Sequence, residues 1–324
     1  MSTVAVVVIG RNEGERLKRC LLSLRDQGAR VVYVDSGSQD DSVMMAQRMG
    51  VETIVLDDAS PFTAARGRNS GFAALTANNA VDYVQFVDGD CGVEPGWIAK
   101  AQSVLDEDPS IGVVTGWRTE LEPHRNVFHA MCEVEWHRPP GPIAACGGDM
   151  MVRVDAFRMV GGFNPRIIAS EDEEFCLRLT ERTGKRVHRL PQIMTHHDIR
   201  MSRFKEWWLR HVRAGHGFAE VGGIYPLHFR RERQRAWFYA LALPIIAITA
   251  LSVGHLWIIG LVGLFYLMNW LRTAWGLKQA GLGARSALQH GGYILLSKFA
   301  QLVGMVTFHA RRIQGAGFRL IEYK

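Results

Sequence analysis

Residues 236–271 contain no Asp, Glu, Lys or Arg, and this run of 36 residues constrains the fold more than any other feature of the sequence. A single helix of that length would measure about 54 Å, far more than the hydrocarbon core of a bilayer, which is about 30 Å thick. Two helices of about 18 residues each would fit that core, and Gly254 and His255 mark the natural break between them. We therefore expect a two-helix transmembrane hairpin within residues 236–275, rather than a buried hairpin of a soluble protein.

The positive charge of the chain is confined to its C-terminal part. Residues 230–324 contain 12 Lys or Arg and only two acidic residues, a net charge of +10, whereas residues 1–229 carry −4. Arginines precede the first apolar segment and follow the second, and the loop between the two has no Lys or Arg. The positive-inside rule therefore places both flanks in the cytoplasm. These arginines lie beside apolar segments rather than along a stripe with stacking aromatic residues, so we expect membrane lipids, and no nucleic acid, as partners.

Residues 286–310 are apolar but are interrupted by His290, Lys298 and Gln301. If this segment crossed the membrane a third time, the arginines that follow it would be exported, against the positive-inside rule. We therefore favour a helix that lies at the membrane interface, followed by a basic cytoplasmic tail. No signal peptide is expected, because Met1 leads directly into a strand-like run.

Residues 1–200 alternate between strand-like and helix-like segments. Residues 4–9 are a continuous apolar run rich in β-branched residues, which is typical of a strand buried on both faces. Further strand-like runs occupy residues 31–34, 53–56 and 83–87, and helix-like runs occupy residues 16–27 and 40–49. This alternation predicts an α/β domain with a mostly parallel sheet and flanking helices. Ligands of such sheets bind beyond the carboxyl ends of the strands.

Two carboxylates follow the strand-like run that ends at residue 87. Asp88 and Asp90 are two residues apart at the exit of this strand, where together they can hold one divalent cation and face its ligand. Because many turns contain the same pair, the position after a buried strand is what favours a metal site over an ordinary turn.

Several motifs, in their order along the chain, resemble family 2 glycosyltransferases with the GT-A fold. They are Gly-Arg-Asn-Glu at residues 10–13, Asp-Ser-Gly-Ser at 35–38, Arg-Gly-Arg-Asn at 66–69, Asp-Gly-Asp at 88–90, Gly-Gly-Asp at 147–149, Val-Gly-Gly-Phe at 160–163 and Ser-Glu-Asp-Glu-Glu-Phe at 170–175. The resemblance covers about residues 4–200, and the C-terminal hairpin resembles that of many bacterial members more loosely. It implies the following organisation: a GT-A catalytic domain over residues 1–200 that faces the cytoplasm, an amphipathic interfacial segment over 201–235, the transmembrane hairpin over 236–275, and a membrane-associated helix with a basic tail over 276–324.

The resemblance also implies a site for a nucleotide-sugar donor. The set of donor-binding residues is Gly10, Arg11, Glu13, Asp35, Arg66, Asp88, Gly148, Arg210 and Arg213. Asp35 would accept the N3–H of uracil, which favours a UDP-sugar, although an Asx turn with the residues after it is the alternative. Arg66 matches the family's basic residue near the nucleotide, with a surface salt bridge as its alternative.

The catalytic and metal-binding roles are implied in the same way. Asp90 would coordinate Mg²⁺ or Mn²⁺, Asp88 would bind the ribose or help to hold the metal, and His197 would be a further ligand. Asp172, with Glu171 as second choice, would be the base that deprotonates the acceptor hydroxyl. An acidic cluster here is also what a helix N-terminus favours, which is the alternative for these residues.

Residues 204–216 contain Trp and basic residues, but not in the Gln/Arg-x-x-Arg-Trp order of the family's processive synthases. Single transfer is therefore favoured over polymerisation. We interpret this segment as an amphipathic helix at the membrane surface, in which Arg210 and Arg213 hold the diphosphate or serve only to anchor the helix to lipid.

The resulting hypothesis is an inverting, metal-dependent glycosyltransferase that acts on a membrane-presented, lipid-linked acceptor in polysaccharide or glycolipid assembly. One alternative is a polyprenyl-phosphate glycosyltransferase, whose acceptor is a phosphate and needs no base. The alternative of another class is a catalytically silent, nucleotide-binding membrane module.

Overall fold

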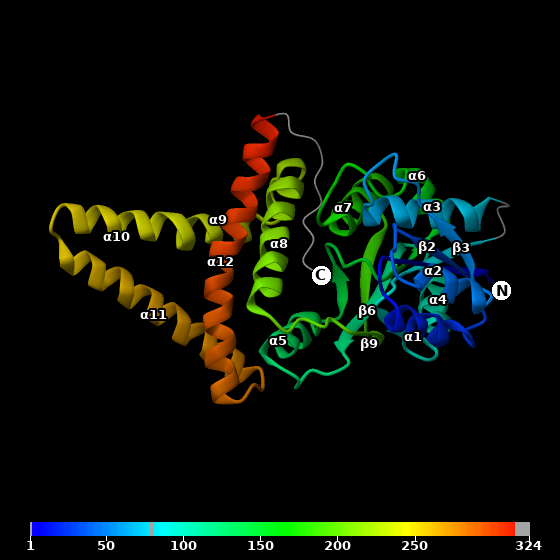
Figure 1. Cartoon of the computed structure of the whole chain (residues 1–324), viewed down its shortest axis with the longest axis horizontal. Coiled ribbons are helices and arrows are strands. Elements are labelled where there is room, and N and C mark those ends of the chain that lie inside the picture. The colour runs from blue at the N-terminus through cyan, green and yellow to red at the C-terminus, as the bar shows by residue number, and fades with distance from the viewer. Residues whose placement is uncertain (1, 78–80, 315–324) are drawn as a thin grey trace. The chain divides into compact units, whose positions relative to one another are not determined.

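The computed structural model describes residues 2–77 and 81–314 (Figure 1). These residues form two compact units. The first unit contains residues 2–125 and 132–200, apart from the undescribed 78–80, and the second contains residues 126–131 and 201–314.

Nine strands among the described residues form one mixed sheet in the first unit. Its parallel half has the order β3-β2-β1-β4 and consists of β1 (Val4–Gly10), β2 (Arg30–Asp35), β3 (Glu52–Val55) and β4 (Tyr83–Asp88). The sheet continues through β8 (Met150–Arg153), β6 (Ile111–Glu120), β9 (Arg186–His197) and β5 (Cys91–Val93), with β7 (Gly141–Ile143) also paired to β9. In this second half β6 and β9 are parallel to each other, and the remaining pairs are antiparallel.

Helices cover both faces of the sheet, as the sequence predicts. They are α1 (Glu15–Leu24), α2 (Ser42–Arg48), α3 (Ala64–Thr76), α4 (Trp97–Glu107), α6 (Val154–Val160) and α7 (Glu171–Thr183). A further helix, α5 (Val127–Trp136), has residues in both units. Alternate residues of β1 enter different cores: Val7 packs with Phe72 and other aromatic rings, whereas Val8 packs with Leu17 of α1. The continuous apolar run of β1 is therefore explained by burial on both faces, and the predicted α/β fold is confirmed.

The register of the parallel strands aligns the residues at their carboxyl ends. Gly10 at the end of β1 pairs with Asp35 of β2, and Ile9 pairs with Asp88 of β4. The polar residues that follow three neighbouring strands therefore meet at one edge of the sheet, where ligands of such sheets bind.

The second unit is helical. Its elements are α8 (Phe204–Ile224), α9 (Arg230–Trp237), the π-helix η1 (Phe238–Ala242), α10 (Leu243–Ser252), α11 (Leu256–Gln279) and α12 (Ala284–Ile313). Helices α10 and α11 form a hairpin that breaks at Gly254, whose φ is 78°, as the sequence predicts. The widened turn η1 ends two residues before Pro244, which lacks the N–H that a continuous α-helix would use at that position.

Three helical segments in the described part of the chain are long and apolar enough to cross a membrane: Arg230–Ser252, Leu256–Gln279 and Ala284–Ile313. On the hairpin, large apolar side chains are exposed, including Ile248 at 67% and Trp257 at 65%. Contiguous apolar exposure of this kind suits lipid rather than water. We therefore describe the second unit as membrane-associated.

Helix α12 packs along α8, and both helices run across the direction of the α10–α11 hairpin (Figure 1). A Cβ at Gly215 of α8 would lie 2.0 Å from the carbonyl oxygen of Gln301, and one at Gly304 of α12 would lie 2.0 Å from that of Val212. Glycine therefore allows the two backbones to touch. If the α10–α11 hairpin crosses the bilayer, a helix that runs across the hairpin lies along the bilayer surface. The interfacial position of residues 286–310 therefore stays our prediction.

Replacing Gly304 by Val should destabilise the second unit by about 1–3 kcal/mol or more, because the added side chain meets the backbone of α8. Thermal unfolding of the full-length protein in detergent measures the effect. Gly263→Val on α11 is the control, since no atom lies within 4 Å of a Cβ there. Equal stability of the two variants would contradict the close packing of α8 and α12.

Candidate active site

The loops after β1 and β2 are bound to each other. Asn12, with a φ of 55°, donates its N–H to Ser38 Oγ at 2.8 Å and accepts the N–H of Gln39 at 2.7 Å. An Asn tolerates this left-handed conformation better than most residues. Because the two loops hold one another, the edge of the sheet that they form is preorganised.

Asp35 closes an Asx turn, which is the alternative that the sequence left open. Its buried carboxylate accepts the N–H groups of Gly37 and Ser38 at 3.0 and 2.7 Å, together with the hydroxyls of Tyr33 and Ser38. Burial and the hydrogen bond to Asp35 raise the pKa of Tyr33, so this phenol stays neutral and remains a donor. A uracil N3–H would have to replace one of these donors, and the contact of Asp35 with a base stays a prediction.

Phe62 lies near two of the predicted donor-binding residues. The guanidinium carbons of Arg11 and Arg66 lie 5.7 and 6.0 Å from the centre of its ring. Gly37, with a φ of 80°, leaves room for this ring, because a Cβ there would lie 2.9 Å from it. The region therefore combines an aromatic face with two cations, which suits a base and the phosphates attached to it.

Arg66 forms the salt bridge that was the alternative to nucleotide binding. Its guanidinium donates to Asp57 Oδ1 at 2.6 Å and to the carbonyl oxygens of Asp57 and Ser60. The hydrogen bond from Arg66 lowers the pKa of the Asp57 carboxyl. Arg66, in the first turn of α3, is thus bound to the loop that precedes this helix, and a role toward the nucleotide stays a prediction.

The cation that joins the candidate site residues of β4 and α7 is Arg68, two residues further on. Its buried guanidinium donates to Asp88 Oδ1 at 2.8 Å and to Glu171 Oε1 at 2.7 Å. Burial by itself would lower the pKa of Arg68, but Asp88 and Glu171 raise it above its usual value. Gly148 lies against this guanidinium, since a Cβ there would meet Nη2 at 1.9 Å. Gly148, which the sequence places near the substrate, therefore leaves the space that the Arg68 guanidinium occupies.

Asp88 is held from its other side by Asp149 and Arg118. The Asp88 N–H donates to Asp149 Oδ1 at 2.9 Å, and Arg118 lies 2.7 Å from Asp149 Oδ2 and 3.5 Å from Asp88 Oδ2. Thr195 donates to the same Asp149 carboxylate at 2.9 Å. Asp88 is therefore fixed between two guanidinium groups.

Asp90 and His197, two of the three predicted metal ligands, are brought together. Asp90 Oδ2 lies 3.3 Å from His197 Nε2, and both side chains are buried. Ligand atoms of Asp90, Cys91 and His197 all lie within 4.8 Å of one another. Asp88, the third predicted ligand, instead contacts Arg68 and Arg118.

This donor set fits a hard or borderline divalent cation. A carboxylate and an imidazole are ligands for Mn²⁺, and a carboxylate suits Mg²⁺. Burial, and next the charge of Asp149, raise the pKa of the Cys91 thiol, so it stays neutral and donates toward Asp90 Oδ1. Asp90 and His197 are therefore the residues that would hold the ion.

The orientation of His197 is set by its neighbours. Its Nδ1 lies 3.6 Å from Glu120 Oε2, and its ring packs edge-on against Trp136. A carboxylate behind a histidine in this way fixes the ring of a metal ligand. Burial lowers the pKa of His197, but Asp90 and Glu120 outweigh it, so the net shift is upward. His196 points to the opposite side and contacts Glu94, which agrees with the expectation that only one of the two histidines serves the site.

Glu171 and Asp172 open α7 but have different surroundings. Glu171 is buried and paired with Arg68, whereas Asp172 is half-buried and accepts the N–H of Glu173 at 2.8 Å. A Cβ at Gly147 would lie 3.8 Å from Asp172 Oδ2, so this glycine leaves space beside the carboxylate. Burial, followed by the charges of Glu171 and Glu173, raises the pKa of Asp172 to about 8. Of the two candidates, Asp172 thus has the properties of a base that works near neutral pH.

The remaining predicted residues have these positions. Gly10 ends β1, and a Cβ there would lie 3.1 Å from Glu13 Cγ. Glu13 forms an ion pair of 2.5 Å with Arg16, whose Nη1 also lies 3.9 Å from Asp90 Oδ2. Arg210 and Arg213 lie on α8 of the second unit, and their roles stay predictions.

Sequence reasoning missed several residues of the site. Their shared property is that they hold the predicted residues in place, and they are Arg16, Phe62, Arg68, Arg118, Glu120 and Asp149. Two signals were available, because Arg68 and Asp149 lie inside motifs that carry the family resemblance.

Comparisons with known proteins show what the chain is similar to. The family model described as Glycosyl transferase family 2 matches residues 5–159. The pre-mycofactocin glycosyltransferase of Mycobacterium tuberculosis is 29% identical over 273 residues, which make up 78% of this chain and 53% of that protein. The chain thus spans about half the length of this relative.

Two solved structures have a similar fold. The structure of S. aureus TarS aligns with a TM-score of 0.51 at 14% identity, over 93% of this chain and 55% of TarS. The glucosyl-3-phosphoglycerate synthase from Mycobacterium tuberculosis, in complex with Mn²⁺ and UDP-glucose, aligns with a TM-score of 0.50 at 17% identity, over 68% of this chain and 79% of the synthase. At these identities the alignments show a shared fold.

Replacing Arg68 by Ala should cost about 3–5 kcal/mol of folding stability, since it leaves Asp88 and Glu171 without their shared cation. Arg66→Ala is the matched control two residues away, and it should change stability little because its partner Asp57 is exposed. Denaturant unfolding of both variants measures the difference. A larger loss for Arg66→Ala than for Arg68→Ala would refute the assignment of the central cation.

Proposed function

The chain belongs to glycosyl transferase family 2, and from this premise we propose that it transfers one sugar, with inversion, from a UDP-sugar to a hydroxyl of a lipid-linked acceptor at the cytoplasmic face of the inner membrane. The observation that carries the proposal is the separation of two neighbouring carboxylates: Glu171 is neutralised by Arg68, and Asp172 keeps a raised pKa beside Gly147. Such a carboxylate is suited to take a proton from an alcohol.

In the proposed reaction the acceptor hydroxyl attacks the anomeric carbon of the donor. Asp172 takes the hydroxyl proton as the new carbon–oxygen bond forms, and the bond to the diphosphate breaks, so UDP leaves with the electron pair. A single displacement of this kind inverts the anomeric carbon. Because the pKa of Asp172 is about 8, its conjugate acid is weaker than an ordinary carboxylic acid, and its ionised form is a correspondingly stronger base.

The donor would lie beside the carboxyl ends of β1, β2 and β4. Phe62 and Arg11 offer an aromatic face and a cation near Asp35, and Asp88 is held in a fixed orientation by two arginines. UDP as the nucleotide is supported by the similarly folded synthase, which was solved with UDP-glucose. A fixed carboxylate is suited to accept hydrogen bonds from a ribose.

Metal dependence is supported by the buried pair of Asp90 and His197 and by the Mn²⁺ in the same synthase structure. When bound, the ion would neutralise the charge that develops on the departing diphosphate. Asp90 would supply an oxygen ligand, and Glu120 would hold the ring of His197 so that Nε2 faces the ion.

A membrane-presented acceptor is supported by the apolar helices of the second unit. A polyprenyl phosphate is the alternative, and with such an acceptor Asp172 would be dispensable. Pre-mycofactocin is a second candidate acceptor, because the relative named for it is 29% identical over most of this chain. A catalytically silent membrane module is the alternative that transfers nothing.

Release of UDP from a panel of UDP-sugars, measured with membrane lipid extract and Mn²⁺, should exceed background and be abolished by EDTA or Asp90→Ala. Asp26→Ala, at an exposed carboxylate, is the control and should retain activity. Replacing the lipid extract by pre-mycofactocin tests the second acceptor. No release from any donor with either acceptor would favour the silent module.

Asp172→Asn should lower transfer to a hydroxyl acceptor by about 10²–10⁴-fold, because the amide accepts no proton. The kcat/KM of the wild type should rise about tenfold per pH unit up to a pH of about 8 and then level off, as the carboxylate becomes ionised. Glu173→Gln is the matched control: it should keep activity and move the midpoint to lower pH, since the charge of Glu173 contributes to the raised pKa.

Two outcomes would contradict the role of Asp172 as the base. Near-wild-type transfer by Asp172→Asn would favour a phosphate acceptor, which needs no base. A pH profile whose midpoint does not respond to Glu173→Gln would assign the titration to another group.

A further inference from the structure

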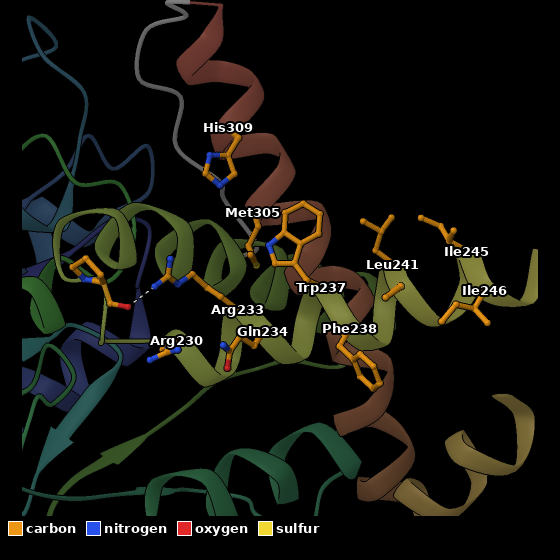
Figure 2. Close-up of a pocket in the computed structure, with 12 residues that line it drawn as sticks. Arg230, Arg233, Gln234, Trp237, Phe238, Leu241, Ile245, Ile246, Met305 and His309 are labelled. Atoms are coloured by element: carbon orange, nitrogen blue, oxygen red, sulfur yellow. Dashed lines mark hydrogen bonds between the residues drawn. The ribbon is translucent and has the colours of Figure 1, made fainter. Parts of the chain in front are cut away.

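The second unit contains a groove of about 850 Å³ that lies outside the candidate active site (Figure 2). It is formed by α9, η1 and α10 on one side and by α12 on the other. Its volume falls within the range of roughly 300–1,000 Å³ that is common for sites of small molecules. All of its lining residues belong to the second unit, so it exists independently of the transfer site.

One end of the groove is basic. Arg230, Arg233 and His309 line this end together with Gln234, and none of the described residues that line the groove is acidic. Arg233 is fixed in place, because its Nη2 donates to the carbonyl oxygen of Pro226 at 2.7 Å and its Nε packs against Gly222 (Figure 2). The positive end is therefore suited to an anion.

The rest of the groove is apolar. Trp237, Phe238, Leu241, Ile245 and Ile246 line it and are exposed. They follow one another along Arg230–Ser252, a segment long and apolar enough to cross a membrane. A hydrocarbon chain that lay along these side chains would start beside Arg230 and Arg233. It would then continue into the region where the hydrocarbon of the bilayer would surround the helix.

These two properties together define the occupant. A water-soluble phosphate would gain nothing from the apolar wall, and a neutral lipid would gain nothing from the arginines. We propose that this groove binds one membrane lipid with an anionic phosphate head group, with the phosphate at Arg230 and Arg233 and the hydrocarbon chain along Leu241 and Ile246. The site is separate from the proposed transfer reaction, since none of the residues assigned to that reaction lines it.

Native mass spectrometry of the full-length protein in detergent tests this site. Dioleoyl phosphatidylglycerol should bind at least about tenfold more tightly than dioleoyl phosphatidylcholine, which has the same chains and no net charge. The double variant Arg230→Gln with Arg233→Gln should lose this preference. Arg231→Gln with Arg235→Gln is the matched control, because it removes the same charge from the same helix at residues that do not line the groove.

A second variant tests the apolar wall without a change in charge. Ala242→Phe adds a ring to the lining, and it should weaken binding of both lipids. Thermal unfolding of each variant shows that it is folded, and Arg230→Gln alone replaces the double variant if the latter does not fold, since Arg230 is exposed.

Three results would overturn the proposal. They are equal binding of the two lipids to the wild type, an equal loss of preference in the control pair, and displacement of phosphatidylglycerol by millimolar inorganic phosphate. The last result would identify a site for soluble anions. Failure of sugar transfer in any assay has no bearing on these measurements, so the groove and the enzyme activity are tested separately.

Discussion

The buried guanidinium of Arg68 is the interaction on which the candidate active site depends. It joins Asp88, at the end of β4, to Glu171, at the start of α7, two elements far apart in the sequence. Taking three charges out of water is costly, and the arrangement is stable only because each carboxylate receives a hydrogen bond from the same planar group. The position of α7 relative to the strand ends is therefore set by a charge that no single element could bury alone.

The two ion pairs of Arg68 also give chemically similar carboxylates different surroundings. Glu171 and Asp88 are paired with cations, while Asp172, the next residue after Glu171, lies beside two negative charges and has a raised pKa. On the other side of Asp88, Arg118 and Asp149 repeat the pairing. Asp90 faces His197, with Arg16 further away at 3.9 Å. Environment, and not residue type, thus separates the fixed carboxylate of Asp88 from the proposed base and the proposed metal ligand.

The features that the sequence predicted are those that depend on local pattern. The burial of β1, the carboxylates after β4 and the break at Gly254 follow from runs and turns of a few residues. The features that it missed depend on packing between distant segments. Arg66 and Arg68 belong to one motif, yet residues two apart on a helix point to nearly opposite sides, and only the tertiary fold shows that Arg68 faces the carboxylates. The contact of α8 with α12 through glycine is of the same kind.

The charge of the assembled site explains why a cation belongs in the proposed reaction. In the ion-pair network around Asp88 and Asp90, the described acidic groups outnumber the basic ones even with Asp172 protonated and His197 charged. The acidic groups are Glu13, Asp88, Asp90, Glu120, Asp149, Glu171 and Asp172, and the basic groups are Arg16, Arg68, Arg118 and His197. An anionic diphosphate would be repelled by this excess, the more so because the residues are largely buried. Since Arg16, Arg68 and Arg118 are each paired with a carboxylate, a bound cation would add positive charge that these three residues do not offer. A divalent cation held by Asp90 and His197 would supply this positive charge and offset the repulsion of the diphosphate.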